Sequence, residues 1–535
     1  YINSPFKLTR IRDLPPASNV DTVSISDILG SPMIKEVWIF NFLFDIDFIM
    51  ANLDRDVRNE VSVKIVHGFH NGDEVLETDA RRWPRVRLIP TWVPDWGTHH
   101  SKMMVLIYHD ECMRIVVHTS NMIEKDWTNL TQGVWMSPFL PLKDATTPIK
   151  PRASHASGSS AFATSESPDP PFGTGERFKL DLVRYLHGYD KLVQHLIAII
   201  DDYDFSAIHA AFIGSVPGHT DAIPGDSKTA WGWPGLREVL HHVSCRDEEG
   251  EVPQIAMQVS SIATLGGKRD WIDNFLDVLS TKAPLTENEL LLLPISKGKS
   301  KVRDIKPEPH LIFSTPEEIR TSLDGYASGG SIHAKVSSAS QKKQLAYLHP
   351  MMRHWDASVL SPKPPAQPPS RQALRGKAAP HIKTYIRFSS ARMDRIDWAL
   401  LTSANLSTQA WGHVAKERHG KGKVWVSSYE CGVLVWPALF AESGNKKEDV
   451  AMVPVFGKDK AEPGDVGRVE NRQERNDGGG GESAKEGLDM RKPKTVVGIR
   501  MPYDLPLVPY EEDEQPWAKE MVHVEPDFLG WVWMG

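Results

Sequence analysis

The chain has 535 residues, 40% of them hydrophobic, and a formal net charge of −7. This length predicts two domains, and the net negative charge argues against a protein that coats nucleic acid non-specifically. Cys112, Cys245 and Cys431 are too few and too scattered for a disulfide framework or a Cys-x-x-Cys zinc site, which is typical of a reducing intracellular compartment. No apolar stretch has the length of a membrane-spanning helix, so we expect no membrane association. The chain starts at Tyr1 without an initiator Met, and we expect it to be part of a longer chain.

Apolar runs and period-two alternation predict strands in the first half of the chain. They fall at residues 37–40, 61–65, 103–108, 114–118 and 132–135. Residues 178–199 keep apolar side chains at helical spacing, which predicts helical structure there.

A strand over 208–213 begins the second half of the chain. Farther along, we predict helices at 236–243 and 271–279 and strands at 398–401 and 433–436. Strands mixed with helices in both halves indicate an α/β fold in which helices flank sheets.

Three segments have few large apolar side chains and are rich in Ser, Pro, Gly or charge: residues 144–175, 361–379 and 457–494. They cannot bury enough apolar surface to offset the entropy of ordering, so we predict surface insertions in loops or disorder.

A pattern of polar residues occurs twice in the chain. Gly97-Thr98-His99-His100-Ser101-Lys102 is echoed by Pro380-His381-Ile382-Lys383. Each copy is followed by an apolar stretch and then by Thr119-Ser120-Asn121 or by Thr402-Ser403-Ala404-Asn405. A Trp lies six residues after each Asn, at Trp127 and Trp411, and a strand-like segment follows at Gln132 or Glu430. The repeat of all these elements predicts a duplicated site.

A His-x-Lys triplet on its own is a weak signal. Two more triplets, His333-Ala334-Lys335 and His419-Gly420-Lys421, lack the downstream Thr-Ser-Asn. We interpret both as solvated loop residues.

Two sets of imidazole, ammonium and carboxamide groups are what phosphodiester chemistry without a metal requires. One His can attack phosphorus, the second can transfer a proton, and fixed donors can hold the phosphoryl oxygens. Neither set is complete alone. We therefore predict two similar domains, residues 1–206 and 207–535, that face each other with pseudo-two-fold symmetry and share one active site. No metal site is expected, because adjacent histidines such as His99 and His100 point to opposite faces of a strand.

The paired motifs resemble those of the phospholipase D superfamily, in which each domain is an α-β-α sandwich. That superfamily typically has an Asp five positions after the Lys, where this chain has Ile107 and Phe388. The His-x-Lys…Asn form is similar to the tyrosyl-DNA phosphodiesterase branch. The stretches that carry this resemblance are residues 97–104, 118–121, 131–133, 380–385, 402–407 and 428–430.

The resemblance implies an enzyme, without metal or cofactor, that hydrolyses the bond between a topoisomerase tyrosine and a DNA 3′ end and clears other 3′ adducts. His100 would be the nucleophile that forms a phosphohistidine, and His381 the general acid and then the general base. The groups that hold the nonbridging oxygens would be Lys102, Lys383, Asn121 and Asn405. Gln132 and Glu430 would orient the two imidazoles. Because a carboxylate best supports a nucleophile that must bear positive charge, we favour Glu430 on His100 and Gln132 on His381, although the sequence leaves both pairings open.

Further substrate contacts are implied by the same resemblance. The candidate DNA contacts are Ser260, Ser261, Ser331 and Ser403, with Trp96 as an aromatic that stacks on a base. Phe42 and Trp517 are candidates for the peptide side. Each Ser has an alternative interpretation as a turn or cap residue, and the aromatic residues could belong to the core. The expected partners are a DNA 3′ end and a topoisomerase I-derived peptide, and the expected state is a nuclear monomer.

Two alternatives remain at this point. The chain could be another member of the superfamily, a phospholipase or a nuclease, or a catalytically inactive module that binds DNA ends. The missing Asp and the lack of a membrane segment weigh against a phospholipase. The complete set of two imidazoles, two ammoniums and two amides weighs against a module that only binds.

Overall fold

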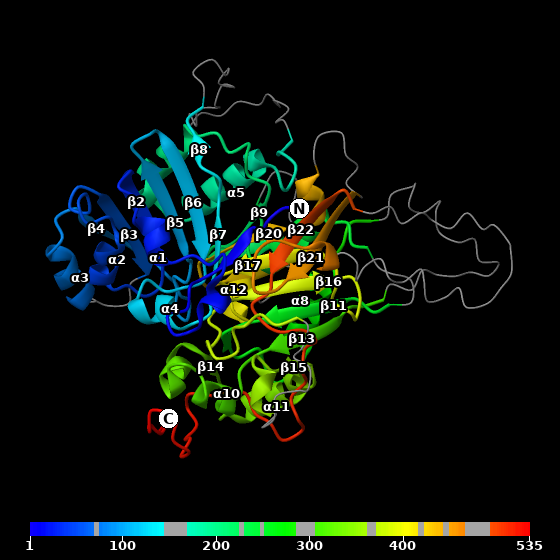
Figure 1. The fold of residues 1–535 in the computed structure, drawn as a ribbon. Coiled ribbons are helices and arrows are strands. Elements are labelled where there is room, and N and C mark those ends of the chain that lie inside the picture. The colour runs from blue at the N-terminus through cyan, green and yellow to red at the C-terminus, as the bar shows by residue number, and fades with distance from the viewer. Residues whose placement is uncertain are drawn as a thin grey trace, which may run out of the picture.

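The computed structural model describes residues 1–68, 74–143, 168–223, 229–246, 251–284, 305–360, 371–415, 422–441, 449–465 and 493–535. Within these ranges two mixed β-sheets lie side by side, the first drawn in blue and cyan and the second in green to orange (Figure 1). The change from one sheet to the other falls after helix α6 (Gln194–Asp201), before strand β9 (Ala211–Ser215).

The first sheet has the strand order β1-β7-β6-β5-β2-β3-β4, with β8 paired to β6. The pairs β2–β3 and β3–β4 are parallel, and the other neighbours along this order are antiparallel. Its strands are β1 (Phe6–Leu8), β2 (Ile34–Phe40), β3 (Ser62–Gly68), β4 (Val86–Thr91), β5 (Met103–Tyr108), β6 (Cys112–His118), β7 (Gly133–Met136) and β8 (Leu140–Pro141).

The second sheet has the order β15-β13-β11-β16-β17-β20-β9, extended by β21 and β22. The pairs β15–β13 and β13–β11 are parallel, and the remaining neighbours along this order are antiparallel. Its other strands are β11 (Gln254–Gln258), β13 (Glu308–Ile312), β15 (Met352–Arg353), β16 (Thr384–Phe388), β17 (Ile396–Thr402), β20 (Glu430–Val435), β21 (Val450–Val455) and β22 (Thr495–Arg500).

The two sheets repeat one topology. Two parallel pairs lead in each sheet to an antiparallel strand that directly follows a His-x-Lys motif, β5 in the first and β16 in the second. The next strand, β6 or β17, ends just before the Asn, and β7 or β20 follows it in the sheet. The expectation of an α/β fold with two similar halves is confirmed.

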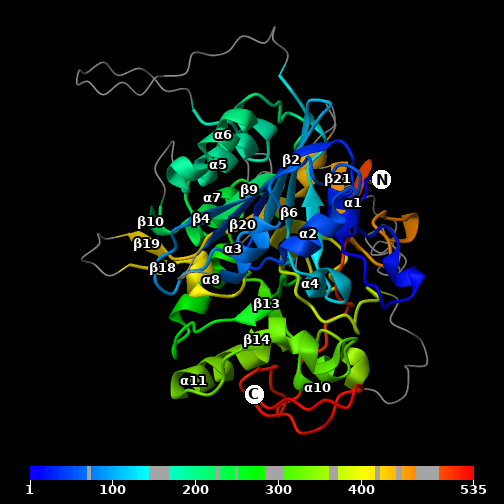
Figure 2. The same ribbon diagram turned by 90° about the vertical axis from the view of Figure 1, so that its left-hand side faces the viewer.

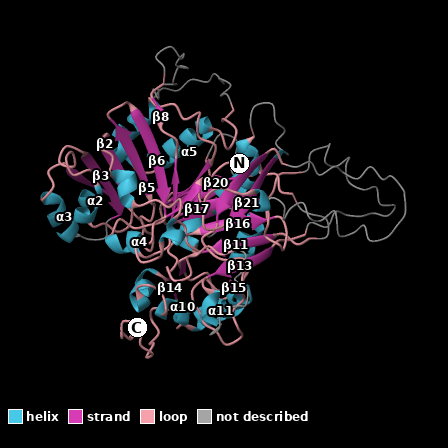
Figure 3. Ribbon diagram, viewed as in Figure 1, coloured by secondary structure: helices cyan, strands magenta, loops and turns pink. Residues whose placement is uncertain are grey.

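Helices cover the outer faces of both sheets and fill the space between them (Figures 2 and 3). The core between the sheets contains α5 (Gly175–His187) and α6, and β5 contributes alternate residues to it and to the opposite core. This explains why β5 is apolar throughout, since both of its faces are buried. The other helices are α1 (Ile25–Leu29), α2 (Ile46–Asn52), α3 (Glu74–Arg81), α4 (Glu124–Thr128), α7 (Trp233–Leu240), α8 (Asp270–Leu279), α10 (Pro316–Arg320), α11 (Ala339–Leu348) and α12 (Thr408–Trp411).

Two small sheets complete the described fold. One joins β10 (Gly218–Asp221), β19 (Lys423–Val426) and β18 (His413–Val414). The other is a parallel pair of β12 (Ser261–Ile262) and β14 (His333–Ala334).

The elements predicted from apolar spacing are present, with shifted ends. The predicted helices at 236–243 and 271–279 correspond to α7 and α8, and the strand predicted at 208–213 begins three residues later as β9. The prediction of loops or disorder in the insertions is only partly testable, because 144–167, 361–370 and 466–492 lie outside the described residues.

The described parts of two insertions, 168–174 and 371–379, are loops as predicted, but they are packed against the protein, which corrects the prediction that they lie on its surface. Asp169 forms an ion pair with Arg184 at 2.7 Å. Arg375 is fully buried and donates to the Thr9 carbonyl at 2.9 Å. Scattered anchors of this kind order a segment that has little apolar character, which composition alone does not reveal.

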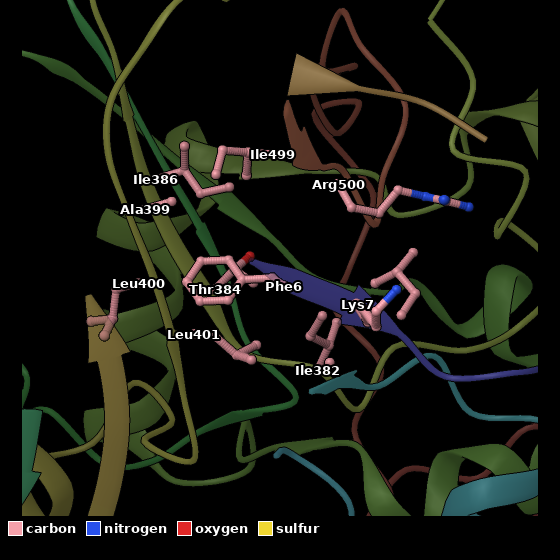
Figure 4. Close-up of a pocket in the computed structure, with 12 residues that line it drawn as sticks. Phe6, Lys7, Ile382, Thr384, Ile386, Ala399, Leu400, Leu401, Ile499 and Arg500 are labelled. Carbon is pink, nitrogen blue, oxygen red and sulfur yellow. The ribbon is translucent and has the colours of Figure 1, made fainter. Parts of the chain in front are cut away.

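Side chains fill the space between the sheets almost completely. A cavity of about 10 Å³ remains beside β1, β16 and β17, lined mainly by apolar residues such as Ile386 and Leu401 (Figure 4). This volume is that of about one water molecule, so the cavity is a packing void and cannot admit a substrate.

Backbone hydrogen bonds cross from each motif to the opposite half of the chain. His100 N–H donates to the Tyr429 carbonyl at 3.0 Å, and Tyr429 N–H donates to the Thr98 carbonyl at 2.9 Å. In the second copy, His381 N–H donates to the Thr131 carbonyl at 3.0 Å, and Thr131 N–H donates to the Ala379 carbonyl at 2.9 Å. Each His-x-Lys motif is therefore held by the residues just before β20 or β7 of the other half.

The closeness of this crossing gives a first prediction. A Cβ on Gly97 would lie 2.0 Å from the Ser427 carbonyl oxygen, so Gly97→Ala must push the two segments apart. We expect Gly97→Ala to lower kcat/KM by about tenfold or more, because a shift of about 1 Å at a reacting group is already costly. Gly464→Ala is the matched control, since a Cβ there meets nothing within 4 Å. Equal activity of the two variants would show that the crossing does not position His100.

Candidate active site

The repeated motifs come together where the two halves meet. His100 and Lys102 precede β5, and Asn121 follows β6. His381 and Lys383 precede β16, and Asn405 follows β17. The same ends of equivalent strands thus present the same side chains. Glu430 of the second half contacts His100, and Gln132 of the first half contacts His381, which brings the two sets together in one site.

The His100 imidazole is held by a carboxylate from the second half. Its Nδ1 lies 2.9 Å from Glu430 Oε2, and Ser403 Oγ donates to the same oxygen at 2.5 Å. Burial lowers the pKa of His100, and Glu430 opposes that shift. Burial also disfavours the charged carboxylate, yet the contact with His100 keeps the pKa of Glu430 below its usual value. The favoured pairing of Glu430 with His100 is confirmed as a contact.

The His381 imidazole is held by an amide from the first half. Its Nδ1 lies 3.0 Å from Gln132 Nε2 and 3.2 Å from Gln132 Oε1. Thr119 Oγ1 donates to that Oε1 at 2.7 Å, while Nε2 donates to the Asp126 carbonyl at 3.2 Å. An Nδ1–H donated to Oε1 leaves the Nε2 of His381 as the nitrogen that can exchange a proton with substrate. Burial and the charge of Lys383 hold the pKa of His381 well below its usual value.

Ser403 was predicted to contact DNA, and this prediction is wrong. The residue is fully buried, and its hydroxyl accepts from the Cys431 N–H at 3.0 Å while donating to Glu430. Thr119, also two residues before an Asn, makes the matching contacts with the Gly133 N–H and with Gln132. Ser403 is thus a positioning residue for Glu430.

The two lysines are buried cations. Lys102 and Lys383 are both 0% exposed, and each Nζ donates to the carbonyl of the His two residues earlier, at 3.3 and 2.5 Å. Burial lowers the pKa of Lys102 to about 8 and holds that of Lys383 well below its usual value. The nearby charge of Lys102 also lowers the pKa of Lys383. A phosphodiester anion bound between them would offset charge that the protein leaves only partly compensated.

The two asparagines are held by different partners. Asn121 N–H and Nδ2 both donate to Asp126 Oδ2, at 2.8 and 2.9 Å. Asn405 Oδ1 accepts from the N–H groups of Ser260 and Ser261 at 3.0 and 2.9 Å, and from Ser260 Oγ at 3.2 Å. The amide nitrogen of Asn405 is thereby left for a phosphoryl oxygen.

The Trp six residues after each Asn has a structural role. Trp127 Nε1 donates to the Asn121 carbonyl at 2.9 Å, and Trp411 Nε1 donates to the Asn405 carbonyl at 3.0 Å. Each indole thus fixes the turn that carries the amide.

The predicted DNA contacts have different surroundings. Ser260 is only 1% exposed and its hydroxyl bonds to Asn405, and its contact with DNA stays a prediction. Ser261 and Ser331 are partly exposed, and their contact with DNA stays a prediction. Trp96 is 89% exposed and has a φ of +65°, which holds its indole out from the loop before His100.

The two predicted peptide contacts also differ. Phe42 is 44% exposed, and its ring centroid lies 5.7 Å from that of His100, so it lines the site. Trp517 is fully buried and donates from Nε1 to the carbonyls of Gly329 and Ile332. Its indole supports the segment that carries Ser331, and its place near the peptide side stays a prediction.

Asp126 is the main residue that sequence reasoning missed. It is fully buried, its Oδ2 lies 3.5 Å from His381 Nδ1, and burial raises its pKa. Its position five residues after Asn121, within the short helix α4, carries no motif, and the second copy has no acidic counterpart at Ala410.

The described ranges contain no group of three or more His, Cys, Asp or Glu side chains arranged to hold a metal ion. They also contain no helix of sufficient length and hydropathy to cross a lipid bilayer.

Comparison with known proteins decides the family. The sequence profile described as Tyrosyl-DNA phosphodiesterase matches residues 5–511. The chain belongs to the tyrosyl-DNA phosphodiesterase family. It is therefore a phosphodiesterase of the phospholipase D superfamily, a hydrolase whose family acts on DNA in repair.

Individual relatives agree with this assignment. A probable tyrosyl-DNA phosphodiesterase of Schizosaccharomyces pombe is 30% identical over 99% of this chain and 96% of its own length. Tyrosyl-DNA phosphodiesterase 1 of Arabidopsis thaliana is 29% identical over 99% of this chain and 76% of its own. The crystal structure of the yeast enzyme has a TM-score of 0.61 at 19% identity, covering 96% of this chain and 98% of the other, and so shares its fold.

The burial of Lys383 predicts opposite effects on stability and activity. Replacement of a buried, poorly compensated cation by an apolar side chain removes its desolvation cost. We expect Lys383→Met to raise the free energy of unfolding by about 1–3 kcal/mol and to lower kcat/KM by about 100-fold or more. Urea denaturation and steady-state kinetics measure the two effects, with Lys191→Met as an exposed control. A fall in stability would mean that the bond to the His381 carbonyl outweighs burial.

The pKa of Lys102 predicts the alkaline limb of the pH profile. Its ammonium loses its proton as pH rises through about 8, so the free enzyme loses a cation that binds the phosphoryl oxygens. We expect kcat/KM to fall above about pH 8 in the wild type. Lys102→Gln should be much less active and lack this limb, whereas Lys191→Gln should retain it. An unchanged alkaline limb in Lys102→Gln would assign it to another group.

Proposed function

We propose that this chain hydrolyses the 3′-phosphotyrosyl bond left by stalled topoisomerase I, and other 3′ adducts, through a phosphohistidine and without a metal. The observation that carries the proposal is the pair of imidazoles, one buried and one largely buried, each held at Nδ1 by a side chain from the opposite half. This arrangement leaves two Nε2 atoms, one on a carboxylate-backed ring and one on an amide-backed ring.

In the first step, His100 Nε2 attacks phosphorus and the bond from phosphorus to the tyrosyl oxygen breaks. His381 gives its Nε2 proton to that oxygen. Glu430 favours the positive charge that the His100 ring acquires, because an adjacent carboxylate stabilises an imidazolium. The bound phosphodiester anion raises the pKa of His381 toward the working range, since it offsets the lysine charges that depress it.

In the second step, neutral His381 takes a proton from water, the water oxygen attacks phosphorus, and the bond to His100 Nε2 breaks. The products are a DNA 3′ phosphate and the original His100. Lys102, Lys383, Asn121 and Asn405 hold the nonbridging oxygens in both steps, the work that Mg²⁺ performs in kinases.

The surroundings of the site support DNA as the substrate. The indole of Trp96 is available to stack on a base next to the reacting phosphate. Because one chain supplies both halves of the site, the enzyme can act as a monomer. An enzyme that acts on topoisomerase I adducts is expected to act in the nucleus. The complete catalytic set favours this reading over an inactive DNA-end binding module.

The experiment distinguishes the roles of the two histidines and is carried out in a buffer with excess EDTA. A 3′-phosphotyrosyl oligonucleotide should be cleaved by the wild type, because the lysines replace the metal. His381→Asn should accumulate a covalent protein–DNA adduct on a denaturing gel, since a phenolate with a pKa near 10 can leave slowly but water is no longer activated.

The control is the nucleophile variant. His100→Ala alone should form no adduct, and adding it to His381→Asn should remove the adduct. Adduct formation by His100→Ala would show that His100 is not the nucleophile. Loss of wild-type cleavage in EDTA, restored by Mg²⁺, would refute the metal-free mechanism.

A further inference from the structure

His333 lies beside the active site rather than in a solvated loop. It belongs to β14, which pairs in parallel with β12, so that His333 stands opposite Ser261. Its N–H donates to the Ser260 carbonyl at 3.0 Å, and Ser260 in turn bonds to Asn405. The sequence interpretation of His333-Ala334-Lys335 as solvated loop residues is therefore wrong for this histidine.

The ring of His333 is close to the catalytic groups and has no assigned partner. The charges of Lys383 and His100 contribute to the lowered pKa of His333, and the charge of His333 contributes to the lowered pKa of His381. The ring is partly buried, and its Nδ1 is buried without a hydrogen-bond partner. Among the described residues neither ring nitrogen makes a hydrogen bond. Burial, with Lys519 and Lys383, lowers the pKa of His333 to about 4, so the ring is neutral at physiological pH.

The strand that carries His333 is fixed on both sides. Trp517 donates to the Gly329 and Ile332 carbonyls and accepts from the Ala334 N–H at 3.3 Å. Just beyond β14, Glu520 Oε1 accepts from the N–H groups of Val336 and Ser337 at 2.8 and 2.9 Å. A polar ring held this firmly without a partner has the character of a preorganised binding group.

We propose that His333 contacts the leaving group, the tyrosyl or other 3′-blocking group, and so helps to select it. This inference rests on the proposed function. Its basis is the backbone bond from His333 to Ser260, which holds Asn405, together with the buried Nδ1 of His333 that makes no hydrogen bond. A neutral imidazole supplies an N–H donor, an acceptor and an aromatic face, which suit a tyrosyl ring or a peptide amide. It adds no charge to the lysines that bind the phosphate.

The two chemical steps provide the test, because the leaving group is present only in the first. We expect His333→Ala to slow formation of the phosphohistidine on a 3′-phosphotyrosyl peptide–oligonucleotide by about tenfold, with breakdown of the intermediate unchanged within about twofold. Rapid-quench single turnover measures both rates. His109→Ala is the matched control, since His109 is exposed just past the other end of β5 from Lys102.

A second substrate sharpens the test. With a 3′-phosphoryl methyl ester, which has no ring or peptide to contact, His333→Ala and wild type should form the intermediate at similar rates. Equal slowing of both steps would refute a contact that is specific to the leaving group, and no change in either step would refute any contact with substrate. His333→Gln keeps a polar side chain. If it forms the intermediate faster than His333→Ala while breakdown is unchanged, a polar contact has been lost in His333→Ala; lost packing or misfolding would slow breakdown as well. Failure of the wild type to cleave any 3′ adduct would refute the proposed function itself.

Discussion

The reciprocal crossing of backbone between the two halves is the constraint on which the site depends. Residues before β20 bond to the first His-x-Lys motif, and residues before β7 bond to the second. Glu430 and Gln132 directly follow Tyr429 and Thr131, the residues that make the crossing bonds, so each half delivers the group that orients the other half's imidazole. Neither imidazole can be oriented by its own half, and folding of the whole chain is required to assemble either one.

This crossing also explains why the site can hold so many cations. Two lysines and two imidazoles lie close together in a largely buried site, with Glu430 and Asp126 as the nearby carboxylates. Burial lowers the pKa of each of these basic groups, which means that the folded state carries them at a cost in free energy. Packing of two sheets around α5 and α6 supplies the stability that offsets this cost. The uncompensated charge is then available to a phosphodiester anion, with donors already in place when charge develops.

Sequence alone was sufficient for the repeat and for the approximate position of strands that are buried on both faces, but not for the ends of most of them. The β5 strand was predicted from its apolar run, and the pairing of Glu430 with His100 from the charge that a nucleophile must bear. Long-range contacts were not predictable. Ser403 and Trp517 look like surface or substrate residues in a sequence, because nothing local shows that Glu430 or the Gly329 carbonyl lies against them. His333 was misjudged for the same reason, since its strand pairs with β12 across a gap of about seventy residues.

The two halves have the same topology, but they are no longer chemically equivalent. Thr119 and Ser403 occupy the same place and bond to the residue that orients an imidazole, but that residue is an amide in one case and a carboxylate in the other. A carboxylate stabilises a ring that becomes a cation when it bonds to phosphorus. A neutral amide orients the other ring without stabilising its charged form, so that this ring can release the proton on Nε2 and take up another. In the proposed mechanism, this exchange of Glu for Gln between duplicated positions is one difference that divides the pair of histidines into a nucleophile and an acid–base group.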